Sequence, residues 1–247
     1  MLNLVCDPAP EEVGARIDWS AWILLAEEDV GQSPEQDHVA RVFESALRQH
    51  LEAPALAGAV VGKDAFFAWV EEEPNVRVSP DVYVLDEPPA PPWPGMWETW
   101  RPGHRPPRFA LELVSEDWKK DYEEAPRKYA LLGARELLVY DPQAARGVAP
   151  APRVPMTVYR READGSFVRT YAGAGPARLE SVDAWAVACP AGGVGWLRVA
   201  RDPGGARLVP TAEERAEAES RRAEAESKRA DALAARLRAL GVDPDEG

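Results

Sequence analysis

Two short apolar segments joined by a helical pattern constrain the fold of this chain most. Residues 108–114 are almost continuously apolar, which is typical of a central strand buried on both faces. Residues 136–140 form a second such segment, and residues 121–132 between them have a helical pattern that ends at Gly133. A strand, a helix and a strand of these lengths predict a right-handed crossover. We therefore expect an α/β (α+β) protein with a mixed, partly parallel sheet flanked by helices.

Further helices and strands are expected on both sides of this crossover. Ser33 and Pro34 fit the start of a helix that runs to Glu52 with one apolar face. Alternating or apolar segments predict strands at residues 57–61, 66–70, 76–85, 154–161, 166–171, 196–200 and 206–209. The fourth and fifth of these would form a hairpin. Residues 87–108 are rich in proline and are expected to form a loop.

The composition changes to Ala, Glu, Arg and Leu in residues 211–240, which predicts a long helix before an acidic tail at 241–247. A seven-residue repeat, typical of coiled coils, is carried by Ala216, Ala223, Ala230 and Leu237. A coiled coil would join two chains as a homodimer. Because alanine seams bury little surface, a solvated single helix fits the pattern equally well.

The charge balance restricts the partners of the chain. Its formal net charge is −13 at pH 7, whereas proteins that hold nucleic acid through many phosphate contacts usually have a basic surface. Tight non-specific DNA binding is therefore not expected. A nuclease stays possible, because a bound divalent cation or a local basic strip can offset phosphate charge.

The sequence gives no sign of export or membrane insertion. Residues 1–7 lack the basic region of a secretory signal, and the longest early apolar run, 19–26, is too short for a membrane span. Cys6 and Cys189 cannot form a disulfide framework or a thiolate metal site. We expect a cytoplasmic protein with no membrane partner.

Asp81 and Glu112 are the candidate site residues. Glu112 lies inside an apolar strand, and Asp81 follows Pro80 at the edge of another. A buried carboxylate is costly unless it is paired or binds a cation, and two neighbouring carboxylates oppose each other's ionisation. Mg²⁺ or Mn²⁺ would remove that conflict, because hard divalent cations bind carboxylate oxygens. The alternative is that Asp81 caps a turn while Glu112 pairs with a buried Arg or Lys.

Several short segments resemble the Uma2 family, also called DUF820, in their order and spacing. They are residues 78–84, 111–115, 129–137 and 140–142. Members of this family resemble bacterial endonucleases with the PD-(D/E)xK, restriction-endonuclease-like fold. The resemblance covers about residues 20–190 and implies a nuclease-like domain at 20–210, after a lead-in at 1–19.

The resemblance implies a metal-dependent endonuclease that hydrolyses DNA phosphodiester bonds. Asp81 and Glu112 would bind Mg²⁺ or Mn²⁺, with the Leu113 carbonyl as a further candidate ligand. The competing hypothesis is a weakly active or inactive protein of the same fold, which acts in binding or assembly through its C-terminal helix.

The lysine of the nuclease motif is missing from the two positions where the resemblance places it. Val114 and Ala125 stand there instead. Lys119, Lys120 and Lys128 are the candidate replacements. We favour Lys120 as the third catalytic residue, because it lies just ahead of the predicted helix on the same side as Asp121; the alternative is an ordinary surface lysine.

Two further groups of residues are candidates for a role at the site or in substrate binding. His38 and Glu44, at the start and along the first helix, are candidate additions to it, whereas His50 falls on the apolar face and is expected to be packed. Aromatic residues in the proline-rich loop could stack on bases. The alternative, which we favour, is that they hold the loop against the domain or a partner; these residues are Trp93, Trp97 and Trp100.

Overall fold

The structure is a computed structural model of the 247-residue chain. It describes residues 23, 33–53, 56, 58–191 and 194–240. The contacts within the chain divide it into two compact units, Met1–Val209 and Pro210–Gly247. The expected lead-in at 1–19 and the acidic tail at 241–247 lie outside the described residues.

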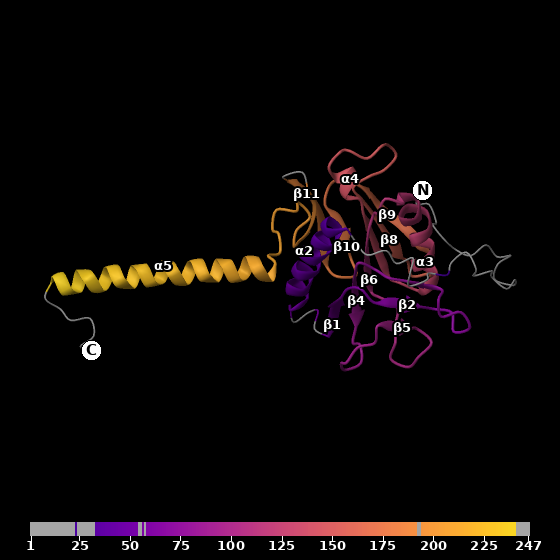
Figure 1. Ribbon diagram of the computed structural model, residues 1–247, viewed down its shortest axis with the longest axis horizontal. Coiled ribbons are helices and arrows are strands. Elements are labelled where there is room, and N and C mark those ends of the chain that lie inside the picture. Colours follow the sequence, from indigo (N-terminus) through magenta and orange to yellow (C-terminus); the bar gives the residue numbers. More distant parts are fainter. Residues whose placement is uncertain (1–22, 24–32, 54–55, 57, 192–193, 241–247) are drawn as a thin grey trace. The chain divides into compact units, whose positions relative to one another are not determined.

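A six-stranded mixed sheet forms the centre of the first unit (Figure 1). In spatial order its strands are β1 (Ala59–Gly62), β4 (Val82–Asp86), β6 (Phe109–Leu113), β7 (Glu136–Tyr140), β8 (Met156–Arg161) and β9 (Phe167–Gly173). Strands β6 and β7 pair in parallel, and the other neighbours pair antiparallel. The structure thus confirms the predicted α/β fold with a partly parallel sheet.

Local sequence signals explain where the helices of this unit begin and end. Helix α2 (Pro34–Leu51) starts with a capping box, in which Ser33 and Gln36 satisfy each other's backbone N–H groups. The crossover from β6 to β7 contains the π-helical turn η3 (Lys120–Glu124) and helix α3 (Ala125–Leu132). Gly133 ends α3 with a φ of 92°, a left-handed conformation that glycine adopts without strain.

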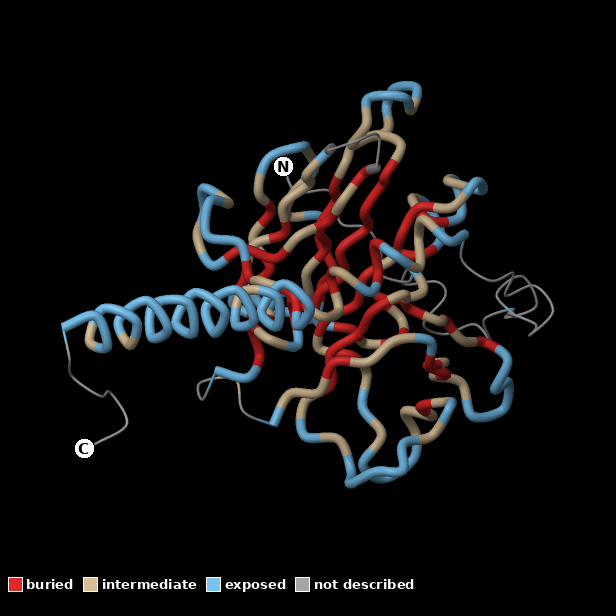
Figure 2. Tube along the Cα trace, turned by 60° about the vertical axis from the view of Figure 1, so that its left-hand side comes forward, coloured by how far each residue is buried: buried red, intermediate tan, exposed pale blue. Residues whose placement is uncertain are grey.

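Alternate residues of the central strands face two separate cores. On one face, Phe109 and Leu111 pack with α2, and on the other, Ala110 and Leu137 pack with α3. We call these the α2 face and the α3 face. Figure 2 shows the central strands as the most continuous buried part of the chain. Packing on both faces therefore holds β6 in place. It also fixes the direction in which each of its side chains points, including that of Glu112.

Two three-stranded sheets flank the central one. The first comprises β3 (Arg77–Val78), β2 (Phe66–Ala68) and β5 (Met96–Glu98), with β2 in the middle. The second comprises β10 (Ala177–Leu179), β11 (Ala184–Ala191) and β12 (Val194–Ala200), and its buried residues join the core of the α2 face. The short helix α4 (Pro142–Ala145) follows β7.

Three details of the sequence-based assignment are wrong. Residues 76–85 are not one strand, because the chain leaves β3 at Ser79 and enters β4 only at Val82, in another sheet. The proline-rich segment is not wholly a loop, since it contains β5. Around 206–209 the only pairing in the described chain is one bridge between Leu208 and Ala200. Apolar residues keep alternating from β3 through Ser79 and into β4. The alternation therefore could not show that residues 76–85 form two strands.

The second unit contains helix α5 (Ala212–Ala239), which Thr211 and Glu214 start with a capping box. None of its residues is buried, and Leu233 is 61% exposed. The coiled coil and the homodimer remain predictions. In the described part of the chain, no helix combines the length and the apolar character needed to cross a membrane.

Candidate functional site

Asp81 is tied to the main chain on both sides of Glu112. The backbone N–H of Asp81 donates to the carbonyl of Leu111 at 3.0 Å, and a side-chain oxygen of Asp81 accepts from the backbone N–H of Leu113 at 2.5 Å. The entry to β4 is therefore fixed against the end of β6. This contact places the Asp81 carboxylate next to the strand segment that carries Glu112.

Glu112 lies on the α3 face of β6, where it meets Tyr129. The Tyr129 hydroxyl donates to Oε1 of Glu112 at 2.6 Å, and Tyr129 has no exposed surface. Glu112 itself is half-buried. Burial, and next the charge of Asp81, raise the pKa of the Glu112 carboxyl well above its ordinary value, against the lowering effect of the Tyr129 bond. Removing the proton from Glu112 is thus costly unless a cation is present.

This donor set fits Mg²⁺ or Mn²⁺ with few protein ligands. Among the described residues, no three His, Cys, Asp or Glu side chains gather closely enough to hold a metal by themselves. Mg²⁺ commonly uses only one or two protein carboxylates, keeps several waters and takes phosphate oxygens of the substrate. Asp81 and Glu112 supply two such carboxylates, and their mutual repulsion would be relieved by the ion. That they share an ion, with or without the Leu113 carbonyl, remains a proposal.

Lys120 lies close enough to Glu112 and Asp121 for its charge to affect the pKa of both carboxyls. It is the first residue of η3 and is exposed. Burial raises the pKa of Glu112 and that of Asp121, and the positive charge of Lys120 partly opposes both increases. Lys128 instead forms an ion pair with Glu124 at 3.4 Å.

The two positions where the resemblance calls for lysine are occupied by core residues. Val114 is 5% exposed and Ala125 is 8% exposed, and both belong to the core of the α3 face. A lysine at either position would have to extend its ammonium out of that core. Lys120 therefore remains the proposed third residue of the site.

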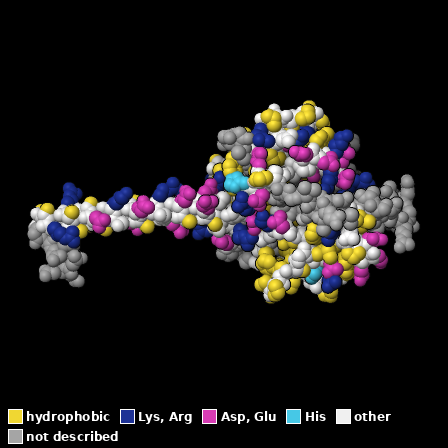
Figure 3. Space-filling model, viewed as in Figure 1, with side chains coloured by type: hydrophobic (Ala, Val, Ile, Leu, Met, Phe, Trp, Pro, Cys, Tyr) yellow, Lys and Arg dark blue, Asp and Glu magenta, His cyan; other side chains and the backbone are white. Residues whose placement is uncertain are grey.

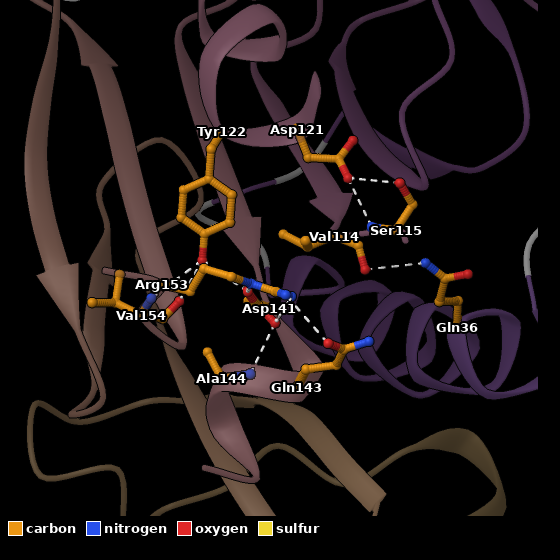
Figure 4. Close-up of polar contacts among 10 residues, drawn as sticks. All are labelled: Gln36, Val114, Ser115, Asp121, Tyr122, Asp141, Gln143, Ala144, Arg153 and Val154. Carbon is orange, nitrogen blue, oxygen red and sulfur yellow. Dashed lines mark hydrogen bonds and ion pairs between the residues drawn. The ribbon is translucent and has the colours of Figure 1, made fainter. Parts of the chain in front are cut away.

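Asp121 is a buried carboxylate near the half-buried pair. Its Oδ2 accepts from the backbone N–H of Ser115 at 2.7 Å and from the Ser115 hydroxyl at 2.9 Å (Figure 4). Burial raises the pKa of Asp121, and these two bonds act in the opposite direction. The side chain of Gln36 from α2 reaches the carbonyl of Val114 in the same region. The chain leaving β6 is thus fixed from two sides before it enters η3.

Tyr122 fixes η3 on its other side, to the end of β7. Its hydroxyl contacts Oδ2 of Asp141 and the carbonyl of Val154, both at 2.9 Å (Figure 4). Arg153 binds both carboxylate oxygens of Asp141, with Nε at 2.6 Å and Nη2 at 2.9 Å. Asp141 also accepts from the backbone N–H of Ala144 and so caps α4. This network anchors the turn that presents Lys120 and Asp121.

The histidines and Glu44 lie apart from Glu112. His38 is exposed and packs edge-on against Trp196 with ring centroids 4.6 Å apart, and Glu44 pairs with Arg48 on the same helix. His50 is buried on the α2 face, with Nε2 3.0 Å from the carbonyl of Val182, so the expectation that it is packed is confirmed. The structure gives none of these residues a contact with Glu112.

The aromatic residues of the proline-rich segment divide into packed and exposed positions. Trp97 is 1% exposed and stacks near Phe67 and His104, whereas Trp93 is 44% exposed. Trp97 therefore holds the segment against the domain, as we favoured. Trp93 stays outside the core and donates only to the carbonyl of Pro89.

The partners of the site were not assigned from sequence. Tyr129 lies in one of the segments that resemble the family, but the sequence alone does not indicate its bond to Glu112. A tyrosine at this spacing on an apolar helix face also fits ordinary core packing. The pair of Asp141 and Arg153 is similarly hidden, since Arg153 lies in a segment that reads as a proline-rich linker.

The fold and the carboxylates together define an α/β protein with acidic side chains gathered at the end of its central strands. The model of the Uma2 family, described as "Putative restriction endonuclease", matches residues 26–183. This match covers more than half of the chain, so the chain belongs to the Uma2 family, and the sequence-based resemblance is confirmed.

Two further comparisons add little to this assignment. A crystal structure of a putative nuclease belonging to DUF820, from Anabaena variabilis, is similar at 11% sequence identity and a TM-score of 0.44, over 61% of this chain and 75% of that one. No curated protein matches the chain.

Proposed function

We propose that this chain is a Mg²⁺- or Mn²⁺-dependent endonuclease that hydrolyses DNA phosphodiester bonds. The observation that carries the proposal is the placement of two carboxylates at the end of β6: Glu112 is bonded to Tyr129, and Asp81 accepts from the backbone N–H of Leu113. Burial and the charge of Asp81 both oppose the ionisation of Glu112. A protein retains such a costly arrangement when it serves a function, and perturbed carboxylates cluster at functional sites. Membership of the Uma2 family supports a nuclease-like activity for this arrangement.

In this proposal the carboxylates of Asp81 and Glu112 hold the cation. When bound, a divalent cation polarises the phosphodiester and lowers the pKa of water at the site. The bonds from Leu113 to Asp81 and from Tyr129 to Glu112 keep both carboxylates oriented before substrate arrives. The Leu113 carbonyl is a candidate further ligand.

Lys120 would offset the charge that develops on the phosphate in the transition state. Its ammonium already acts on Glu112 and Asp121 through charge, and it is exposed to substrate. The anchoring of η3 by Tyr122 limits how far Lys120 can move away from the site.

DNA as the substrate has to be reconciled with the acidic surface. On the face drawn in Figure 3, Lys and Arg side chains are interspersed with Asp and Glu. With a net charge of −13, the whole surface would repel a phosphate backbone at long range. A bound divalent cation and Lys120 would supply positive charge at the point of reaction, so weak, salt-sensitive DNA binding is expected.

Plasmid cleavage tests the proposal. The native chain should nick supercoiled plasmid with Mg²⁺ or Mn²⁺ and be inactive with EDTA. Asp81→Asn and Glu112→Gln should each lower the rate at least about 100-fold, and Lys120→Met about 10²–10³-fold, the cost of removing one charge-stabilising group. Glu123→Gln, an exposed acid on the same turn, is the matched control and should cleave normally.

Two outcomes decide between the proposed and the competing function. Cleavage that survives Asp81→Asn would come from a contaminant or another site and would overturn the assignment of this pair. A native chain that binds Mn²⁺ through Asp81 but cleaves no DNA would favour the binding or assembly protein, whose interaction surface would be the exposed helix α5.

A further inference from the structure

One oxygen of Glu112 is already occupied by a partner from the chain. The Tyr129 hydroxyl donates to Oε1 at 2.6 Å. Tyr129 is fully buried, so no water competes for its hydroxyl from the bulk solvent. Oε2 of Glu112 has no hydrogen bond or ion pair with the described residues.

Tyr129 cannot easily give up this bond. Its ring belongs to the core of the α3 face, together with Ala110, Leu137 and Val139. Its own carbonyl accepts from the backbone N–H of Ala134, which closes the end of α3. Moving the hydroxyl oxygen away from Glu112 would require the ring to leave a close-packed site.

The occupied oxygen limits how Glu112 can bind a cation. A carboxylate binds a metal ion through one oxygen or through both. The Tyr129 bond takes one lone pair of Oε1 and fixes its direction, so Oε2 is the oxygen left fully open to a cation. Mg²⁺ demands near-ideal octahedral geometry and suits single-oxygen ligands, whereas the larger Ca²⁺ accepts carboxylates in either mode and in irregular geometry.

We propose that Tyr129 is a positioning residue that restricts Glu112 to one-oxygen coordination and thereby sets the preference of the site for Mg²⁺ and Mn²⁺ over Ca²⁺. The inference rests on the proposed function, because it takes the metal site of Asp81 and Glu112 as given. It assigns Tyr129 a role in metal selectivity, beyond its packing in the core.

The test compares cation affinities of the full chain and two tyrosine variants by isothermal titration calorimetry. Tyr129→Phe removes the hydroxyl and keeps the ring. Tyr140→Phe is the matched control: Tyr140 is also fully buried, its hydroxyl donates to the carbonyl of Trp196 at 2.9 Å, and it faces the α2 core. Mn²⁺ and Ca²⁺ are titrated separately at the same pH and ionic strength.

The ratio of the two affinities is the decisive quantity. Tyr129→Phe should lower the Mn²⁺-to-Ca²⁺ affinity ratio about 10-fold, the lower end of the effect of losing an outer-shell partner of a metal ligand. Tyr140→Phe should leave the ratio unchanged. A ratio that stays constant in Tyr129→Phe, or that shifts equally in Tyr140→Phe, would overturn the inference, because general loosening weakens both cations alike.

Asp81→Asn separates failure of this inference from failure of the proposed function. If Asp81→Asn binds Mn²⁺ as tightly as the native chain, the metal site itself is misassigned. If Asp81→Asn loses Mn²⁺ binding while Tyr129→Phe keeps the native ratio, only the role of Tyr129 fails.

A measurement on the native chain covers the case in which Tyr129→Phe does not fold. The infrared carboxylate stretches that change on Mg²⁺ addition should show the wide separation of one-oxygen binding. A narrow separation, typical of binding through both oxygens, would overturn the inference without any variant.

Discussion

Two carboxylates at the ends of adjacent parallel strands are treated differently by this chain. Asp141, just after β7, is fully buried and bound by both arms of the Arg153 guanidinium, whose side chain is 6% exposed. Glu112, near the end of β6, makes no ion pair with any Lys or Arg in the described residues. Each carboxylate accepts a tyrosine hydroxyl, from Tyr122 and Tyr129 respectively. The difference between them is the arginine.

This difference separates a structural acid from a candidate functional one. Arg153 neutralises Asp141, and the resulting unit caps α4 and anchors η3. Glu112 receives no equivalent cation from the chain, and its carboxyl keeps a raised pKa. A half-buried acid that the chain leaves without a neutralising cation is available to a cation from solution.

The largest expected effect comes from removing the arginine that neutralises Asp141, so that Asp141, like Glu112, has no ion pair among the described residues. Arg153→Ala would leave a buried carboxylate without its cation and should lower the free energy of unfolding by about 3–5 kcal/mol, measured by urea denaturation. The double variant Asp141→Asn/Arg153→Met should recover part of that loss. Equal destabilisation by the single and double variants would show that the ion pair is not the cause.

The opposite change should stabilise the chain. Glu112→Gln removes a carboxyl whose ionisation is opposed by burial and by Asp81, and it should raise the free energy of unfolding by about 1–2 kcal/mol in EDTA at pH 8. If Glu112→Gln does not raise the free energy of unfolding at pH 8, the charge of the Glu112 carboxylate is already compensated within the chain.

The same variant tests the pH dependence of stability. Because the folded-state pKa of Glu112 lies above its unfolded value of 4.5, the folded chain holds the extra proton between the two. Without metal, the native chain should lose stability as pH rises from about 4.5 through the raised pKa. Glu112→Gln should show a smaller loss over that range in parallel urea titrations.

A smaller effect is expected at Asp121, whose main compensation is its two hydrogen bonds from Ser115. Ser115→Ala removes the 2.9 Å hydroxyl bond but keeps the backbone bond, and should cost about 1 kcal/mol of unfolding free energy. It should also raise the pKa of Asp121 further, because one bond to the charged form is lost. Ser220→Ala, at an exposed position of α5, is the control: it should leave the pKa of Asp121 unchanged and raise the free energy of unfolding by at most about 0.5 kcal/mol, from the higher helix propensity of alanine.

The smallest effect should come from an exposed ion pair. Glu217 and Arg221 lie 3.8 Å apart on α5, with side chains 64% and 73% exposed. Glu217→Ala should change the free energy of unfolding by less than about 0.5 kcal/mol. A loss near that of Arg153→Ala would mean that α5 is buried in a partner, contrary to its exposure in the single chain.

The central crossover could be predicted because its signals are local. The apolar segments of β6 and β7, the helical pattern between them and Gly133 each specify one element without reference to distant residues. The break between β3 and β4 could not be predicted. The two strands join different sheets, but the alternation of apolar residues continues through Ser79 between them. Sheet membership depends on pairing with distant segments, which one sequence does not show.

The candidate site was only half predictable for the same reason. Asp81 and Glu112 stand out as acids beside apolar strands, and Lys120 as a lysine beside the crossover helix. Their supporting residues do not stand out. Tyr129 reads as core, and Arg153 reads as a linker residue 12 positions from the carboxylate that it binds. Such roles arise from tertiary contacts and not from spacing.

The π-helical turn η3 makes the length of the crossover critical. In a regular α-helix, residues 121 and 129 would lie about 80° apart around the axis, at roughly 3.6 residues per turn. The wider turn, closed by a bond from the backbone N–H of Ala125 to the carbonyl of Lys120, reduces that angle. Deleting one residue here would restore an α-helical turn and rotate the anchored residues away from Glu112. Insertions and deletions should therefore be tolerated at the tip of the proline-rich segment around Trp93 far better than between Ser115 and Tyr129, which is a practical guide for engineering loop length in this chain.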